Sequence, residues 1–277
     1  MIEIDFAKIW DDMIIRSGKQ KAKASDGGDN FWKKQENVDR FVDRLMHDDR
    51  GRIENQLKSM NIPSGSTVLD IGAGPGTLAV PLSLNGCKVT TVEPSEPMGA
   101  AMETYRKKTG AHEISEIRSK WEDVSADIVG KHDYVISSLS LMIGDIKNNL
   151  AKMDACADKE VHIFWFLTPP SLSRGNIELW PLLHGEEYCY EPTADILWNV
   201  LYQMGIYANL TIEKRKKSQA YPSLESLYSD YWTRMDVTSE KQKEIIRNYL
   251  KDKIVKVENG YAVPSSTATV HVWWKKE

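Results

Sequence analysis

Apolar residues in the first sixty positions of the chain recur every three or four residues, which is the period of an amphipathic helix. This pattern predicts a helix over residues 6–14 that ends at Ser17-Gly18, and further helices over residues 38–46 and 53–60. The polar stretch Lys19–Asn30 between the first two is typical of a loop. Because so few residues bury too little surface to be stable alone, we expect these helices to pack on the rest of the chain.

From residue 67 onwards the period changes, and short apolar runs alternate with helical stretches. The expected strands are Thr67–Ile71, Lys88–Glu93, Glu113–Arg118, Asp133–Ser138, Glu160–Leu167, Tyr207–Lys216 and Thr267–Trp274. Strands that alternate with helices predict a parallel sheet with both faces covered, and right-handed crossovers make it doubly wound. The fold class is therefore α/β, with a doubly wound and mostly parallel sheet.

Two segments interrupt this alternation. Residues 168–192 are rich in proline and aromatic residues, and residues 218–262 contain stretches with the period of amphipathic helices. We therefore divide the chain into a helical N-terminal cap over residues 1–60 and a second domain over residues 61–277. The second domain carries helical insertions at about 168–192 and 218–262.

The 277-residue chain has no dominant charge, since 36 Lys and Arg stand against 40 Asp and Glu. This balance disfavours a protein whose main partner is a nucleic acid. The sequence contains no apolar run of about 18 residues, the length that a membrane-spanning helix needs. Its first residues do not resemble a signal peptide. Three widely spaced cysteines predict no disulfide framework. We expect a reduced, cytoplasmic protein with no membrane partner, and the sequence leaves the oligomeric state open.

A glycine-rich turn follows the first expected strand. Asp70 ends that strand, and Gly72, Gly74 and Gly76 lead into a helix. Glycines are needed where a backbone turns tightly and a ligand approaches its amides. A dinucleotide-binding turn requires a third glycine where Thr77 stands here. Asp70 is also a poor neighbour for a pyrophosphate but a good one for an ammonium or sulfonium group. An ordinary strand–helix turn is the alternative.

A second carboxylate, Glu93, ends the next strand. A carboxylate at this position can accept hydrogen bonds from both hydroxyls of a ribose. Together with Asp70 it predicts a site for a nucleoside that carries a cation. S-adenosylmethionine has these parts, which are adenine, ribose, a sulfonium and an amino acid.

The segment from Ile62 to Leu167 resembles the class I S-adenosylmethionine-dependent methyltransferases, whose glycine motif and ribose-binding acid it matches. The resemblance implies a Rossmann-like, seven-stranded sheet, with S-adenosylmethionine as cofactor and S-adenosylhomocysteine as product. It implies that the cofactor contacts Asp70, Gly72, Ala73, Gly74, Gly76, Glu93, Pro94, Met98, Trp121, Glu122, Ser137 and Ser138. Lys120 stands where many members carry an acid, which leaves the adenine amino group to Glu122 or Asp123, with Glu122 preferred. Trp121 has packing under the sheet edge as its alternative role.

The methyl acceptor is expected to be a small molecule. Family members that modify amides or adenine carry an Asn-Pro-Pro-aromatic motif after the fourth strand, and Ser138–Leu141 does not match it. An RNA or protein methyltransferase is the first alternative, favoured by the basic run within Glu213–Lys217. A catalytically silent nucleoside-binding module is the second alternative.

No catalytic residue is identified from the sequence, and His184 is the one candidate for an acceptor contact or base. A zinc site made by His184, Glu186 and Cys189 lacks a second ligand pair, so we expect no metal. His162 and His271 lie inside expected strands and are interpreted as core or edge residues.

The N-terminal cap is expected to act as a lid over the methyl-transfer pocket. Trp10, Phe31 and Trp32 would face that pocket and exclude water when the lid closes. Permanent packing of the same helices is the alternative.

Overall fold

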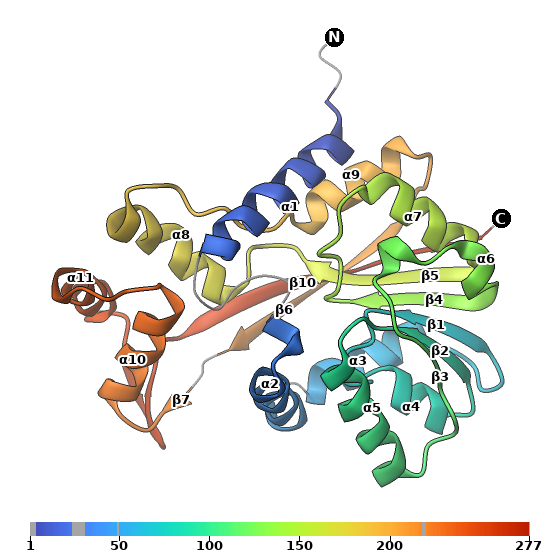
Figure 1. Ribbon diagram of the computed structural model, residues 1–277, viewed down its shortest axis with the longest axis horizontal. Coiled ribbons are helices and arrows are strands. Elements are labelled where there is room, and N and C mark those ends of the chain that lie inside the picture. The colour runs from blue at the N-terminus through green and yellow to red at the C-terminus, as the bar shows by residue number, and fades with distance from the viewer. Residues whose placement is uncertain (1–3, 24–30, 49, 218–219, 277) are drawn as a thin grey trace.

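A computed structural model describes residues 4–23, 31–48, 50–217 and 220–276 (Figure 1). The helices are α1 (Phe6–Lys23), η1 (Phe31–Lys33), α2 (Gln35–Asp48), α3 (Arg50–Met60), α4 (Ala79–Leu84), α5 (Glu96–Thr109), η2 (Trp121–Asp123), α6 (Ala126–Val129), α7 (Ile146–Ala155), α8 (Ser171–His184), α9 (Ala194–Gln203), α10 (Leu224–Arg234) and α11 (Glu240–Leu250). The strands are β1 (Thr67–Ile71), β2 (Lys88–Val92), β3 (Ser115–Ile117), β4 (His132–Ser138), β5 (Ala157–Phe166), β6 (Asn209–Lys217), β7 (Ala220–Tyr221), β8 (Val255–Val257), β9 (Gly260–Ala262) and β10 (Ser265–Lys275).

The described strands form a seven-stranded sheet in the order β3-β2-β1-β4-β5-β10-β6. The first five of these strands are parallel, and β10 is antiparallel to both β5 and β6. This confirms the expected fold class. β1 pairs with β2 on one side and with β4 on the other, so the direction in which strands are added reverses beside β1. Open α/β sheets bind ligands at the carboxyl ends of strands beside such a switch.

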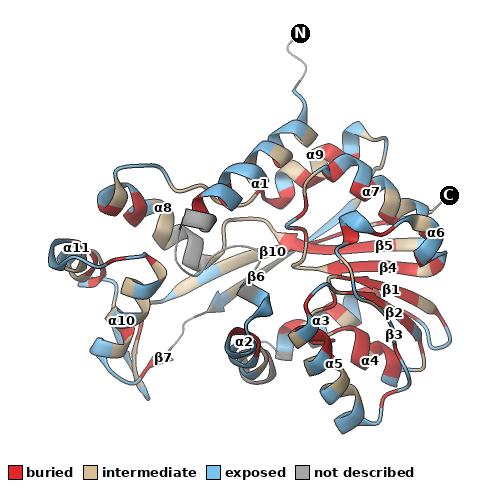
Figure 2. Cartoon of the chain, viewed as in Figure 1, coloured by how far each residue is buried: buried red, intermediate tan, exposed pale blue. Residues whose placement is uncertain are grey.

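Helices cover both faces of this sheet (Figure 1). Residues of α1, α7 and α9 pack in one core cluster, which contains Leu69, Val135 and Trp165. Residues of α3, α4 and α5 pack in the other. The buried residues follow the strands and the inward sides of the helices (Figure 2). The sheet is thus covered on both faces, as the alternation of strands and helices predicted.

A satellite unit lies beside the main sheet and consists of α8, α10, α11 and a small sheet of order β7-β9-β8. Its own apolar cluster includes Leu179, Leu227 and Ile246. α8 lies within the helical insertion expected at about 168–192, although the sequence did not predict its bounds. The helix forms despite Pro181 because its residues pack against α11 in this cluster, and tertiary packing outweighs the lost hydrogen bond.

The first helix is longer than expected. α1 continues through Ser17-Gly18 to Lys23, so the predicted helix end at that dipeptide is wrong. Gln20 explains the extension, because its amide donates to the carbonyl of Glu187 at 2.9 Å and accepts from the Cys189 N–H at 2.7 Å. These hydrogen bonds stabilise the helical turn around Gly18, which the glycine would otherwise weaken. Residues 24–30 of the predicted loop lie outside the described residues.

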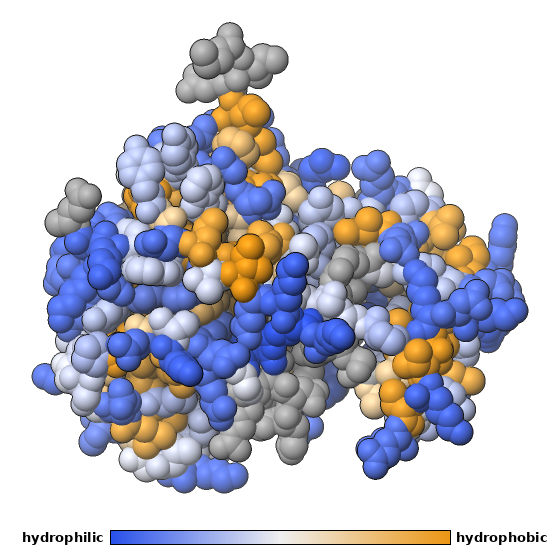
Figure 3. Space-filling view, turned by 180° about the vertical axis from the view of Figure 1, so that it is seen from behind, coloured by the Kyte–Doolittle hydropathy of each residue, from blue (hydrophilic) through white to orange (hydrophobic). Residues whose placement is uncertain are grey.

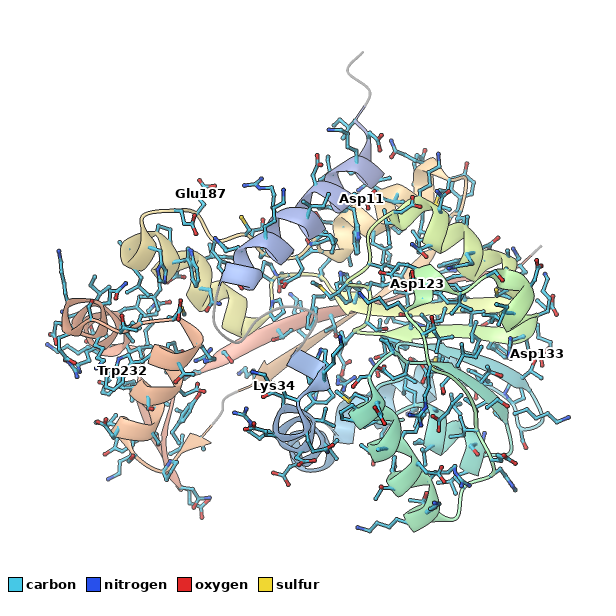
Figure 4. The ribbon with its side chains drawn as sticks, viewed as in Figure 1. Asp11, Lys34, Asp123, Asp133, Glu187 and Trp232 are labelled. Atoms are coloured by element: carbon cyan, nitrogen blue, oxygen red, sulfur yellow. The ribbon has the colours of Figure 1, made fainter. Side chains whose placement is uncertain are left out.

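The N-terminal helices pack at two different places. Trp10 of α1 is fully buried beside Trp165, and its indole N–H donates to the carbonyl of Ile143 at 2.9 Å. Asp11, labelled in Figure 4, accepts from the Ile146 N–H at 3.1 Å. The expectation that Trp10 faces a methyl-transfer pocket is therefore wrong, because the residue is part of the core.

η1 and α2 lie instead near the start of α5. The hydroxyl of Ser95 donates to the carbonyl of Trp32 at 2.5 Å, and the Trp32 ring contacts Phe41. The side chain of Phe31 lies outside the described part of the chain. The domain boundary at residue 60 and the lid over residues 1–60 both stay predictions, although the buried Trp10 shows that α1 is packed against the core.

Two buried histidines lie on the face of the sheet shared by β5 and β10. His162 Nδ1 is 3.0 Å from His271 Nε2, and Glu160 Oε2 is 3.1 Å from His162 Nε2. Burial lowers the pKa of His162 to about 3, with His271 contributing, and lowers that of His271 to about 4. The interpretation of both histidines as core residues is confirmed.

These histidines make the stability of the fold depend on pH. Each stays neutral in the folded chain but takes up a proton near pH 6.5 when unfolded, so its contribution is present above pH 6.5 and falls as the pH drops. Between pH 7 and pH 5 we expect each histidine to remove about 2 kcal/mol of unfolding free energy. Urea unfolding of His162→Phe should show a shallower decline over this range than the wild type. An identical decline in the two proteins would contradict the assignment.

Candidate functional site

Asp70 lies at the end of β1 with its carboxylate buried. It accepts a hydrogen bond from the backbone N–H of Ala79, at the start of α4. Burial first, and the nearby charge of Glu93 second, raise the pKa of Asp70 to about 7. In the described part of the chain, neither carboxylate forms an ion pair. The site therefore concentrates acidic groups that a cation would stabilise.

Glu93 follows β2 and connects the two strand ends. Its Oε2 accepts from the N–H of Gly74 at 2.9 Å, and its Oε1 accepts from the N–H of Ser95 at 2.8 Å. Burial raises the pKa of this carboxyl, and the two backbone hydrogen bonds oppose that rise. Each carboxylate oxygen has two lone pairs, so each oxygen retains one for another donor. The side chain thus orders the glycine turn and still offers two acceptors side by side.

The three glycines of the turn have positive φ angles of 70°, 55° and 78°, but they differ in what surrounds them. A methyl group at Gly72 would lie 2.4 Å from Cβ of Ser140, and one at Gly76 would lie 2.6 Å from Cγ of Met102. A methyl group at Gly74 meets nothing closer than Met98 Sδ at 4.0 Å. Gly72 and Gly76 are therefore required by packing, whereas Gly74 borders open space.

Serines at the end of β4 hold the loop that follows. Ser137 is buried, and its hydroxyl lies 2.8 Å from that of Ser140. The Ser140 hydroxyl also donates to the carbonyl of Ile71 at 2.8 Å. Together with the missing side chain at Gly72, these bonds fix the β4 loop against the end of β1. Sequence analysis placed Ser137 here but missed Ser140.

A polar chain from α3 reaches Ser138 at the same edge. Gln56 Oε1 accepts from the Ser138 hydroxyl at 3.2 Å and from Arg52 Nη1 at 3.1 Å. Both Gln56 and Arg52 are buried. Sequence analysis missed this pair, although two polar residues four positions apart beside the apolar stripe of a helix are an available signal. A guanidinium is thereby held near the end of β4.

The segment after β3 contains the residues expected near adenine. Trp121 is buried in the core, where its indole N–H donates to the Asn149 carbonyl at 3.4 Å and Lys152 lies over its ring at 4.3 Å. Lys152 also donates to the carbonyls of Trp121 and Val124. Glu122 borders a cleft of about 480 Å³ that α7 lines with Asn149 and Lys152. The side chain of Trp121 thus packs, while Glu122 remains accessible.

The remaining predicted contacts lie around the glycine turn. Ala73 and Met98 are buried, and Pro94 is exposed between Glu93 and Ser95. The Ser95 hydroxyl accepts from the Met98 N–H at 3.3 Å and caps α5. The cap fixes the start of α5 next to Glu93, so these residues surround the turn from one side.

His184 lies in the satellite unit, at the end of α8. Its Nε2 is 2.8 Å from the carbonyl oxygen of Met235, and its ring packs on Trp180 with centroids 4.1 Å apart. The contact with Met235 connects α8 to the end of α10, which is a structural role. Within the residues that the structure covers, no group of His, Cys, Asp and Glu could hold a metal ion. No described helix is long and apolar enough to cross a membrane.

Comparisons with known proteins place this geometry in context. No family model matches the chain. An uncharacterized protein of Haemophilus influenzae is 31% identical over 219 residues, which cover 79% of each chain.

Solved structures resemble the fold at low sequence identity. The YcgJ protein of Bacillus subtilis aligns with a TM-score of 0.55 and 14% identity, over 81% of this chain and 97% of that one. A Bacillus halodurans protein with a provisional methyltransferase assignment aligns with the same score and identity, over 81% and 98%. Magnesium protoporphyrin IX methyltransferase of Synechocystis, solved with S-adenosylhomocysteine, aligns with a TM-score of 0.46 and 16% identity, over 97% and 99%. The first two likenesses show the fold.

The two kinds of glycine in the turn can be distinguished by stability. We expect Gly74→Ala to cost roughly 1–2 kcal/mol of unfolding free energy, because its φ of 55° is unfavourable for a side chain. Gly72→Ala should cost a further ~1–3 kcal/mol, since its methyl group overlaps Ser140. Urea denaturation of the two variants measures the difference. Equal losses would mean that Gly74 is as closely packed as Gly72.

Proposed function

We propose a methyl-transfer function for this chain, which belongs to one family with the Haemophilus influenzae protein and has the fold of the class I S-adenosylmethionine-dependent methyltransferases. The observation that carries the proposal is the pair of carboxylates formed by buried Asp70 and partly buried Glu93, beside open space at Gly74. S-adenosylmethionine would bind there, and a small molecule would accept the methyl group.

Glu93 would bind the ribose. The lone pair that each of its oxygens retains can accept one hydroxyl, so the carboxylate suits the two adjacent hydroxyls of a ribose. The open space at Gly74 lets the ligand approach the turn. The cleft beside Glu122 is our assignment for the adenine end, with the Glu122 carboxylate as acceptor for its amino group.

Asp70 and Arg52 would bind the two charges of the amino acid end. Asp70 is buried with a raised pKa, so an ammonium group nearby would favour its ionised form. Arg52, bonded through Gln56 to Ser138, supplies the opposite charge at the end of the adjacent strand β4. This arrangement supports a zwitterion, whereas a pyrophosphate would face two carboxylates, of which Asp70 is buried.

The acceptor would bind beyond β5, where the chain passes into α8. Thr168 Oγ1 and Asn176 Oδ1 are buried there, and neither has a hydrogen-bond partner in the described structure. They are available to a polar acceptor. When bound, the cofactor would supply a methyl group already activated by its sulfonium, with a neutral thioether as the leaving group. The chain then contributes chiefly by alignment, which supplies up to ~7–11 kcal/mol.

Cofactor binding should depend on Glu93. We expect Glu93→Gln to weaken S-adenosylhomocysteine binding by about 10- to 100-fold, since a charged acceptor is worth ~1.5–3 kcal/mol. Glu96→Gln, at an exposed position three residues later, is the matched control and should bind as the wild type does. Titration calorimetry measures both. Tight binding of NAD and none of S-adenosylhomocysteine would overturn the proposal, and binding without methylation of any acceptor would support the silent module.

Binding should also depend on pH through Asp70. Its pKa of about 7 means that the free site is increasingly protonated below pH 7, and an ammonium group must displace that proton. We expect the affinity for S-adenosylhomocysteine to fall toward tenfold per pH unit below pH 7 and to level off above pH 8. Calorimetry in two buffers of different ionisation enthalpy would detect the released proton. Asp70→Asn should flatten this profile, and a flat profile in the wild type would contradict the role of Asp70.

A further inference from the structure

β6 forms one edge of the seven-stranded sheet, and among the described strands it pairs with β10 alone. Residues 209–212 of β6 are exposed, including Leu210 at 47% and Ile212 at 55%. Tyr207, just before the strand, is 75% exposed. On the reverse face of the molecule, hydrophobic residues gather in separate patches among hydrophilic ones (Figure 3). The β6 edge is therefore an open row of backbone groups beside exposed apolar side chains.

The two halves of β6 differ in charge. Edge strands in natural proteins commonly carry lysines that prevent pairing with another chain. The second half of β6 has this protection, because residues 214–217 read Lys-Arg-Lys-Lys. The first half, Asn209–Ile212, has no charged residue and carries the apolar pair. Pairing with another strand is thus opposed at one half and unopposed at the other.

The apolar side chains of the first half continue into α9. Leu210 and Ile212 line a cleft of about 210 Å³ together with Trp198 of α9. The rings of Trp198, Tyr202 and Tyr207 form a row, with successive centroids 5.7 and 5.6 Å apart. A strand added at the β6 edge would place its side chains against this surface. The surface is largely apolar, although Asp195 and Asn199 also line the cleft, and it carries aromatic residues of the kind that are enriched at protein interfaces.

We propose that two copies of this chain associate by antiparallel pairing of their β6 strands about a two-fold axis at Thr211. In this register Ile212 lies opposite Leu210 of the second copy, and Glu213 lies opposite Asn209. The basic run then lies opposite residues 205–208, which carry no charge. The same patch serves both copies, as a closed dimer requires.

Neighbouring registers fit less well. An axis at Ile212 would place Lys214 opposite Leu210, and an axis at Glu213 would place two glutamates opposite each other. The dimer does not depend on the proposed cofactor, because β6 is separated from β1 and β2 by other strands of the sheet.

Sedimentation equilibrium tests the dimer over roughly 1 µM to 1 mM, where small interfaces associate. We expect a dimer whose dissociation constant rises about 100-fold in Ile212→Glu, since two carboxylates would be buried opposite apolar residues. Ile128→Glu is the matched control, because Ile128 is a 70% exposed isoleucine on α6, and it should not change the constant. A monomer over the whole range, or a dimer that Ile212→Glu does not weaken, would overturn the proposal.

Disulfide trapping tests the register. Residues opposite each other in antiparallel strands have Cα atoms about 4.5–5.5 Å apart, which is within disulfide range. In a Cys189→Ser background, Thr211→Cys should therefore give a covalent dimer under mild oxidation, whereas Lys216→Cys should not. Equal cross-linking at the two positions would contradict pairing about Thr211.

Discussion

Two carboxylates, those of buried Asp70 and partly buried Glu93, are held close together at the ends of adjacent strands, without a described cation. Their raised pKa values mean that both lose stabilisation as the pH rises toward neutrality, because ionisation is easier in the unfolded chain. Holding the two carboxylates in this site therefore lowers the free energy of unfolding near neutral pH. That cost is recovered by any ligand that brings a positive charge next to Asp70 and hydrogen-bond donors to Glu93, so the strain itself favours a cationic nucleoside over an anionic one.

The other features of the site follow from keeping these two groups in place. Glu93 needs the N–H of Gly74, which turns toward it because the backbone there is left-handed. That turn requires Gly72 to leave room for Ser140, which in turn bonds the end of β1. The three glycines thus have different roles in the same turn. Two allow close packing, and the one between them leaves space over the turn.

The sequence predicted the sheet well because its central strands, such as β1 and β4, are largely buried and read as apolar runs of the right length. It predicted Asp70 and Glu93 because strand ends in such a sheet meet at one edge. It failed where distant contacts decide the local structure. α1 passes Gly18 because Gln20 bonds the segment after α8, and Trp10 is a core residue because the β4 loop accepts its N–H. The neighbouring residues in the sequence do not indicate either of these hydrogen-bond partners.

The satellite unit, where we propose that the acceptor binds, depends on distant contacts to a larger degree. α8, α10 and α11 come from segments on either side of β6, and they share one apolar cluster with the small sheet β7-β9-β8. In this cluster Trp232 of α10, labelled in Figure 4, lies under two cations of α11, with Lys243 5.1 Å and Arg247 5.2 Å from its ring. The proposed cofactor side is built on short strand ends with a recurrent pattern, whereas the proposed acceptor side is built by docking an added unit. The proposed cofactor side can be predicted from a sequence motif. The proposed acceptor side depends on a packing arrangement that no single segment encodes.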